Sequence, residues 1–524
     1  MLSDKPLLSR IIPGIIYVVV VILGIFLFFA PPSLFPDPAN GFHVMRSMQM
    51  GGGFNQLISP DQSDITQNTS QFLTWWSPGQ YLAPYAFKLL FGLNTGQATA
   101  IVITICQLLG LTGLLAFFRK IGFSATVSAL SILFIACQQF FIIPYVFYNG
   151  GEILFFGFAG WFLYGCTAIN RRGWVLAVFV LLSGWIGFFC KSSMLWMYGA
   201  GMLYLWLRLS MRRSTLDLLL NAAWIAIPAI ISLAGIRIFF LSKGQNPAST
   251  AAPFKFTWKA FGFPLASPLL SGFSIDDLVH GLIYHAGKPK PLFTGTNAVV
   301  VMLILAVLSV WLVRTILQKV GNRTYRLLIR VFYTVAVIFF GYAYLRQMAI
   351  SYEARHFRII GLMVIPGTIF LISRLKPAYR LGFGLIWLFI TITSIVYLVK
   401  GYHYNKTQSA HGVSGLAQQG IDQKSLDQIL SLDRQNKHAI FVFVDESLGL
   451  EIEHNRVITL LPIDNSLKID YDDYEHDGHD GPMYIILPES YAGPKEKMIL
   501  KSFPDYHGWN ASMLSDNYVM YEAK

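Results

Sequence analysis

Long apolar runs are the feature that most constrains the fold of this chain. A helix needs about 20 mostly apolar residues to cross a membrane. Runs near that length cover approximately 11–31, 96–118, 123–143, 152–169, 174–190, 192–209, 217–241, 296–316, 328–346, 357–374 and 381–399. Only 13% of the residues are charged, against about 25% in a typical soluble domain. The sequence therefore predicts an α-helical polytopic membrane protein with about eleven transmembrane helices.

Charge is distributed unevenly along the chain. Residues 1–400 hold 30 Lys and Arg against 9 Asp and Glu, whereas residues 401–524 hold 10 against 19. A positive-inside bias in the short loops explains most of the basic excess, so nucleic-acid binding is not implied. We expect a membrane domain over 1–400 and a separate, acidic extracytoplasmic domain over 401–524.

The positions of Lys and Arg also predict the orientation. Basic clusters such as 119–120, 171–172 and 314–330 fall at every second junction between apolar runs. These junctions should be cytoplasmic, which puts the N-terminus inside and the tail outside. Two long loops, 32–95 and 242–295, then lie on the outer side. The first run is long enough to span and no cleavage pattern follows it. No organelle signal is present, so we expect a plasma membrane, the inner membrane of a prokaryote.

The tail has the pattern of a small α/β domain. Ser425–Leu432 predicts a helix, and His438–Val444, Arg456–Ile463 and Met483–Pro488 predict buried strands. The acidic run Asp470–Asp480 lacks the ligand spacing and closing Glu of a calcium loop. We expect a solvated loop there.

Carboxylates of the membrane domain gather on the predicted outer side. Of the nine in residues 1–400, seven fall there: Asp37, Asp61, Asp64, Glu152, Asp276, Asp277 and Glu353. Charged groups near lipid are costly and often mark functional cavities. One outward-facing polar cavity would produce this distribution. Acids kept solvated in outer loops would also produce it.

A polar stretch directly after the first run, residues 35–81, contains the best catalytic candidate. Asp37 lies between Pro36 and Pro38, which stiffen its backbone. A carboxylate in a partly buried loop can act as a general base. Alternatively, Asp37 caps a helix that begins at Pro38, because Asp before Pro is a good start for a helix.

Three features resemble the GT-C superfamily of integral-membrane glycosyltransferases. The first outer loop begins with an acidic residue, in FPDPANGFH, and leads into the amphipathic segment Gln80–Leu93. A late outer loop reads SYEARHFRIIGLMVIP (Ser351–Pro366) and is similar to a loop in protein mannosyltransferases and aminoarabinose-type transferases. A folded outer domain after the last span is also common in that superfamily. The resemblance implies inverting transfer of a sugar from a polyprenyl-phosphate donor to an acceptor hydroxyl or amine on the outer face.

The resemblance also assigns roles to residues. Asp37 would be the general base, and Arg355, Arg358 and Lys191 would bind the donor phosphate. Substrate contacts would come from His43, Trp75, Trp76, Tyr81, Glu152, Asp276, Glu353 and His356. The alternatives are snorkelling to headgroups for the cations, an interfacial belt for the aromatic residues, and an ordinary loop histidine for His43.

The sequence indicates no cofactor, although a divalent metal stays open as an alternative. Oligosaccharyltransferases of this superfamily use a paired acidic motif with a divalent metal, whereas a lone Asp follows the first run here. The glycines at 51–53 do not form a nucleotide loop, which favours a lipid-linked sugar over a nucleotide sugar. The expected partners are this donor, membrane lipids, and a lipid, protein or glycan acceptor.

Three other classes remain open. A transporter or flippase of lipid-linked glycans would show broken helices and ionisable groups at the membrane centre. A polysaccharide polymerase or ligase would use the same donors but has no need of the tail. A non-catalytic scaffold would use the tail to bind a partner.

Overall fold

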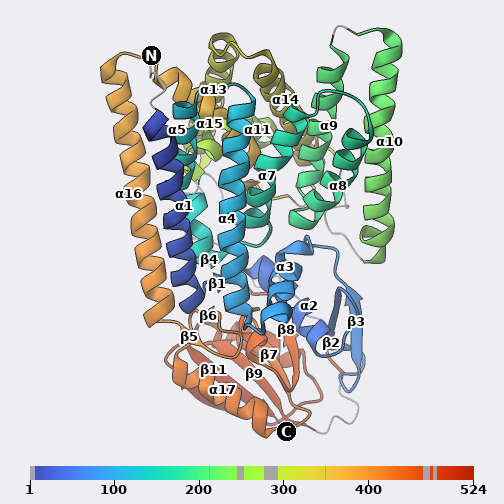
Figure 1. The fold of residues 1–524 in the computed structure, drawn as a ribbon. Helices are drawn as coiled ribbons and strands as arrows, with labels where there is room; N and C mark the ends of the chain where they lie inside the picture. The colour runs from blue at the N-terminus through green and yellow to red at the C-terminus, as the bar shows by residue number, and fades with distance from the viewer. Residues whose placement is uncertain are drawn as a thin grey trace. The chain divides into compact units, whose positions relative to one another are not determined.

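The chain is a mostly helical multi-pass membrane protein (Figure 1). The computed structural model describes residues 6–211, 213–244, 253–276, 293–348, 350–463, 473–475 and 481–523. In these ranges seven helical stretches are long and apolar enough to cross a membrane: Ser9–Phe29, Thr95–Lys120, Thr215–Lys243, Gly295–Lys319, Arg323–Leu345, Ala354–Ile372 and Pro377–Thr407. A bent pair raises the number to eight if it counts as one span. The predicted count of about eleven is not confirmed.

The discrepancy lies between residues 123 and 210, where four spans are predicted. The first folds as α5 (Ala125–Ala136) and α6 (Gln139–Ile142), with a 67° bend between them. Buried Gln138 occupies the break, and its amide donates to the Gly272 carbonyl. Next come α7 (Gly151–Ala168), α8 (Trp174–Cys190) and α9 (Met194–Ser210). The 17 residues of α8 reach only about 25 Å, less than the hydrocarbon core.

Contacts divide the chain into two compact units. Unit 1 comprises 1–24, 103–144 and 151–399, and unit 2 comprises 25–102, 145–150 and 400–524. The long helices α1 (Pro6–Phe29), α4 (Thr95–Lys120) and α16 (Pro377–Thr407) contribute residues to both. The other helices of unit 1 are α5 to α9, α10 (Thr215–Phe239), α11 (Lys259–Gly272), α13 (Gly295–Lys319), α14 (Arg323–Leu345) and α15 (Arg358–Ile372). Separate domains with a boundary at residue 400 remain a prediction.

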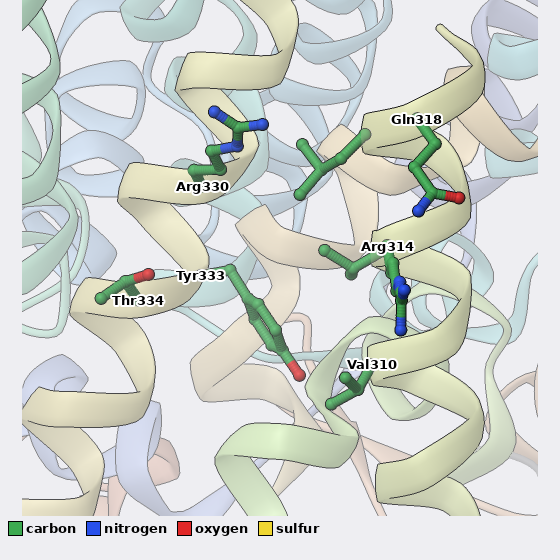
Figure 2. A pocket seen from close by; sticks show the side chains of 8 residues that line it. Val310, Arg314, Gln318, Arg330, Tyr333 and Thr334 are labelled. Atoms are coloured by element: carbon green, nitrogen blue, oxygen red, sulfur yellow. The ribbon is translucent and has the colours of Figure 1, made fainter.

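The short helix α11 organises part of unit 1, because it packs against α13, α14 and α15. Its backbone approaches α15 so closely that a Cβ atom on Gly361 would lie 2.5 Å from the Ser271 carbonyl. Ser309 of α13 donates to the Ala266 carbonyl, and Tyr333 of α14 donates to the Leu265 carbonyl. A pocket of about 400 Å³ opens between α13 and α14 (Figure 2).

Unit 2 is built on a five-stranded sheet with the order β10-β11-β9-β7-β8. The strands are β7 (Ile440–Phe443), β8 (Arg456–Thr459), β9 (Met483–Pro488), β10 (Asn510–Ser515) and β11 (Tyr518–Ala523). β7 runs parallel to β8 and β9, and the other pairs are antiparallel. Leu426, Ile429 and Leu430 of α17 (Gln423–Gln435) pack on one face. The predicted tail helix and three strands are therefore present, and β10 and β11 are additional.

The loop 32–95 belongs to the same unit. It contains β1 (Ser33–Leu34), α2 (Pro36–Gln49), the hairpin β2 (Gln56–Pro60) and β3 (Asn68–Phe72), and α3 (Gly79–Phe91). β1 pairs in parallel with β4 (Phe147–Tyr148). Buried Ile65 joins the core beneath the tail sheet. The amphipathic segment near 80–93 is thus a helix, as predicted. The residues 277–285 and most of Asp470–Asp480 lie outside the described residues.

Candidate functional site

Asp37 lies in the first turn of α2, which begins at Pro36. Phe35 is the N-cap residue and offers no side-chain cap. The helix therefore starts two residues earlier than the capping alternative requires, and Asp37 is inside it. The Asp37 side chain is exposed, in a helix rather than in the partly buried loop we expected. A carboxylate in a first turn is favoured by the helix dipole and remains open to a substrate.

Glu446 is the acidic neighbour of Asp37 that sequence reasoning missed. It lies three residues after β7, next to Asp445, and is buried. Burial, together with the negative charges of Asp445 and Asp37, raises the pKa of the Glu446 carboxyl to about 7. A carboxyl that titrates near neutral pH beside a charged carboxylate is a typical acid–base arrangement. The signal in the sequence was an acidic pair at the end of a buried strand.

His43 ties α2 to the Glu446 segment. Its ring is buried, and Nε2 lies 2.7 Å from the Glu446 carbonyl oxygen. Burial, together with the nearby Arg46 guanidinium, lowers the pKa of His43 to about 4. The ring is therefore neutral at physiological pH and donates its Nε2 proton to that carbonyl. Its position fixes the loop that carries Glu446.

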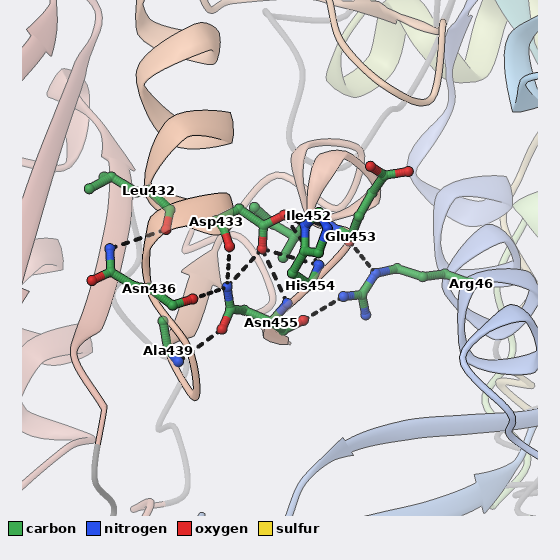
Figure 3. Close-up of polar contacts among 9 residues, drawn as sticks. All are labelled: Arg46, Leu432, Asp433, Asn436, Ala439, Ile452, Glu453, His454 and Asn455. Carbon is green, nitrogen blue, oxygen red and sulfur yellow. Dashed lines mark hydrogen bonds and ion pairs between the residues drawn. The ribbon is translucent and has the colours of Figure 1, made fainter.

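Arg46, one turn further along α2, docks on a loop of the tail (Figure 3). Its Nε donates to the Ile452 carbonyl and its Nη2 to the Asn455 carbonyl, each at 2.6 Å. Asp433 of α17 orders the same loop, since it accepts main-chain N–H bonds from Glu453, His454 and Asn455 at 2.9 to 3.2 Å. The helix that carries Asp37 is thus held by a buried polar network.

Replacing Asp433 by Ala is expected to destabilise the protein by about 3 kcal/mol. The carboxylate is buried, and its loss leaves three main-chain N–H groups without acceptors. Chemical unfolding of the detergent-solubilised protein measures the change. Asp427→Ala on the same helix is the control, because Asp427 is exposed and accepts only from Gln423 among its recorded contacts. Equal stability of the two variants would contradict the role of Asp433.

The perturbed pKa values predict a pH dependence of stability. Between pH 4.5 and 7 folded Glu446 keeps a proton that the unfolded chain has released, so this group makes stability fall as pH rises. His43 acts in the opposite sense between pH 4 and 6.5, because only the unfolded state binds its proton there. Glu446→Gln removes the falling contribution and keeps the carbonyl that His43 binds. The free energy of unfolding of this variant, relative to that of wild type, should rise by about 2 kcal/mol from pH 5 to pH 8.

Thermal unfolding at several pH values checks this prediction. Glu453→Gln is the matched control, because Glu453 is an exposed carboxyl on the neighbouring loop. A difference between Glu446→Gln and wild type that stays constant from pH 5 to 8 would show that Glu446 titrates normally.

Unit 1 contains a cluster of four charged side chains. Lys191, between α8 and α9, places Nζ 2.6 Å from Oε1 of Glu152 in the first turn of α7. Arg355 of η4 (Ala354–Phe357) places Nη1 3.4 Å from the same oxygen, and its Nε pairs with Glu353. The structure thus brings together four predicted site residues from three separate segments. The arginine is the most exposed of them, at 39% of its side chain.

Further predicted residues surround this cluster. His356 Nε2 lies 3.0 Å from the Ser351 hydroxyl, and its buried Nδ1 has no hydrogen-bond partner among the described residues. Asp276 accepts from the Ala354 amide at 3.0 Å and so supports η4. Asp277 lies outside the described residues.

Other predicted contacts are used differently. Arg358 is buried in unit 1, donates to the Ser271 carbonyl at 2.8 Å, and stacks over Phe140. This geometry favours a packing role. Tyr81 of unit 2 is fully buried and donates to Asn55. In the same unit Trp75, which is 43% exposed, and Trp76 pack against one another. Their roles toward a substrate remain predictions.

The charged cluster has the chemistry of an anion site. The charges of the two cations and the two carboxylates cancel. The ion pairs between them hold the cations in place. An arriving phosphate would replace a carboxylate at the exposed guanidinium, which can bind it bidentately. The unpartnered His356 nitrogen also points to a polar group that the described residues do not supply. Among the described residues, no three His, Cys, Asp or Glu side chains gather as a metal site.

Comparison with solved structures identifies the fold. The chain matches ArnT from Cupriavidus metallidurans in the apo state at 11% identity and TM-score 0.51, covering 97% of both chains. ArnT from the same organism bound to undecaprenyl phosphate matches at 12% identity and TM-score 0.50, again over 97% of both. Arabinofuranosyltransferase AftD from Mycobacteria matches more weakly, at 11% identity and TM-score 0.47, over 98% of this chain and 39% of AftD.

The two ArnT matches confirm the predicted GT-C resemblance at the level of the fold, which this chain shares with ArnT. By sequence, no protein-family model and no curated protein matches the chain.

Proposed function

We propose that this protein is a glycosyltransferase that moves a sugar from a polyprenyl-phosphate donor to an acceptor hydroxyl or amine on the outer face of the membrane. The observation that carries the proposal is the fold shared over nearly the whole chain with a protein that binds undecaprenyl phosphate. The charged cluster around Arg355 supports it, since it offers cations suited to a lipid phosphate.

The proposed reaction is a single displacement. Asp37 accepts the proton of the acceptor group while the acceptor atom attacks the anomeric carbon of the sugar. The bond between that carbon and the phosphate oxygen breaks, and its electron pair leaves with the polyprenyl phosphate. Attack opposite the leaving group inverts the anomeric configuration.

Lys191 and Arg355 act on the leaving group in this scheme. The donor phosphate is a diester, and it gains a second negative charge as the sugar departs. Fixed cations that meet this new charge stabilise the transition state more than the ground state. Glu152 sets the position of both cations through its contacts at 2.6 and 3.4 Å. Glu446, protonated for much of the time near pH 7, limits repulsion beside Asp37.

The test is sugar release by the purified protein from a panel of polyprenyl-phosphate sugars, with and without candidate acceptors. Mass spectrometry follows both the freed polyprenyl phosphate and the glycosylated acceptor. We expect one donor to be consumed and an inverted product to form. Consumption of none would contradict the proposal. Movement of a lipid-linked sugar across vesicles without cleavage would favour a flippase instead.

A further inference from the structure

The pocket between α13 and α14 has both polar and apolar lining. Figure 2 shows Arg330 and Tyr333 on one helix and Val310, Arg314 and Gln318 on the other, on opposite sides of one opening. Two guanidinium groups and the Gln318 amide supply polar groups, and the Tyr333 ring and Val310 supply apolar surface. A pocket of about 400 Å³ with this mixed lining suits an amphiphile.

The opening is a built feature of the helix packing. Tyr333 is anchored by its hydroxyl to the Leu265 carbonyl, 2.6 Å away. Ser309, next to Val310, is buried and bonds to the Ala266 carbonyl. Both anchors are on α11, which therefore spaces α13 from α14. The arginines themselves are exposed, at the ends of the two helices nearest their connection.

The charge of this region is one-sided. Residues 314–330 hold five Lys and Arg, and no Asp or Glu occurs anywhere from 278 to 352. Among the described residues Arg314 and Arg330 take part in no ion pair. A second cavity of about 350 Å³ lies next to the first and shares Arg330, with Arg323 and Arg326 also lining it. The positive charge of the pocket therefore favours an anionic ligand.

We propose that the pocket between α13 and α14 binds an anionic phospholipid of the inner leaflet, with its phosphate on Arg314 and Arg330. The acyl chain lies along Val310 and Tyr333. The positive-inside distribution places the 314–330 segment at the cytoplasmic surface, where basic pockets between membrane helices bind anionic headgroups. This proposal does not depend on the glycosyltransferase reaction, because its residues lie outside the charged cluster.

Native mass spectrometry of the full-length, delipidated protein tests the proposal. The probes are phosphatidylglycerol, cardiolipin, phosphatidylcholine, a polyprenyl phosphate and soluble glycerophosphate. We expect phosphatidylglycerol and cardiolipin to bind wild type at least tenfold more tightly than phosphatidylcholine. The double variant Arg314→Gln/Arg330→Gln should lose that preference. Arg10→Gln/Arg171→Gln is the control, because it removes two exposed cations of the same predicted side that do not line the pocket.

Each outcome decides the matter. Loss of the preference in the pocket variant alone supports the site. Equal loss in both double variants would show general attraction to basic loops and overturn it. Binding of the polyprenyl phosphate without the phospholipids would assign the pocket to a carrier lipid and overturn the phospholipid. If glycerophosphate binds as tightly as the lipids, the acyl chain contributes nothing to binding, and this result would overturn the proposed lipid site.

Discussion

Replacing Asp37 by Asn is expected to lower sugar release at least about 100-fold, because Asn cannot take up the acceptor proton. The loss should appear in kcat at saturating donor. The fold should survive, since Asp37 is exposed in the first turn of α2 and the lost helix-dipole interaction contributes only about 0.3–1 kcal/mol. Release from the cognate donor and thermal unfolding of the same preparation measure both effects.

Asp61→Asn is the matched control, because Asp61 lies in the same 32–95 loop and its carboxylate accepts from the Ser63 amide and hydroxyl. Its release should stay at the wild-type rate. A second readout connects Asp37 to its neighbour. Removing the Asp37 charge should lower the pKa of Glu446 and move the fall in stability to lower pH. Full activity of Asp37→Asn would assign the base to another residue, with Glu446 and Glu152 the next to test.

The sequence predicted the membrane helices where length and apolarity coincide. All seven long spans were identified, because a continuous apolar run has few alternatives to crossing lipid. The four spans predicted between 123 and 210 are not confirmed, because the apolar helices there are shorter or broken. Gln138 at the α5–α6 break was the visible sign, but run length outweighed a single polar residue in the prediction.

A candidate site residue could be predicted only where its place in the sequence, such as directly after a span, indicated a role. Asp37 became the candidate base because it comes directly after the first span, and its role remains a prediction. Glu446 was not predicted, because only a tertiary contact brings it to α2. The hydrogen bond between His43 and the Glu446 carbonyl joins residues 403 positions apart. No periodicity reports such a tertiary contact. The strands β10 and β11 were also not predicted. The first four residues of β10 are exposed and β11 does not alternate, so neither strand has a clear pattern of period two.

Arg355 and Arg358 were equal candidates in the sequence, and the structure separates them. They are three residues apart at the start of α15, where η4 gives way to the helix. The first pairs with Glu353 and Glu152 and keeps 39% of its side chain exposed. The second is 7% exposed and bonds to the Ser271 carbonyl. Because their surroundings differ, we expect substitutions of these two arginines to have different effects.

Arg355→Gln is expected to lower sugar release about 100-fold. The loss of one cation that contacts the phosphate typically costs a few kcal/mol of transition-state stabilisation. Its melting temperature should change little, since the side chain is partly exposed and Lys191 remains on Glu152. Binding of undecaprenyl phosphate, measured on the same protein, should weaken in parallel.

Arg358→Gln supplies the contrast. Its main effect should be on stability, by about 1–3 kcal/mol, because a buried charged hydrogen bond and the stacking on Phe140 are lost together. The protein that remains folded should still release sugar at nearly the wild-type rate. The opposite pattern, in which Arg358→Gln weakens lipid binding without changing the melting temperature, would move the phosphate site from η4 into α15. It would leave Arg355 as a partner for the carboxylates alone.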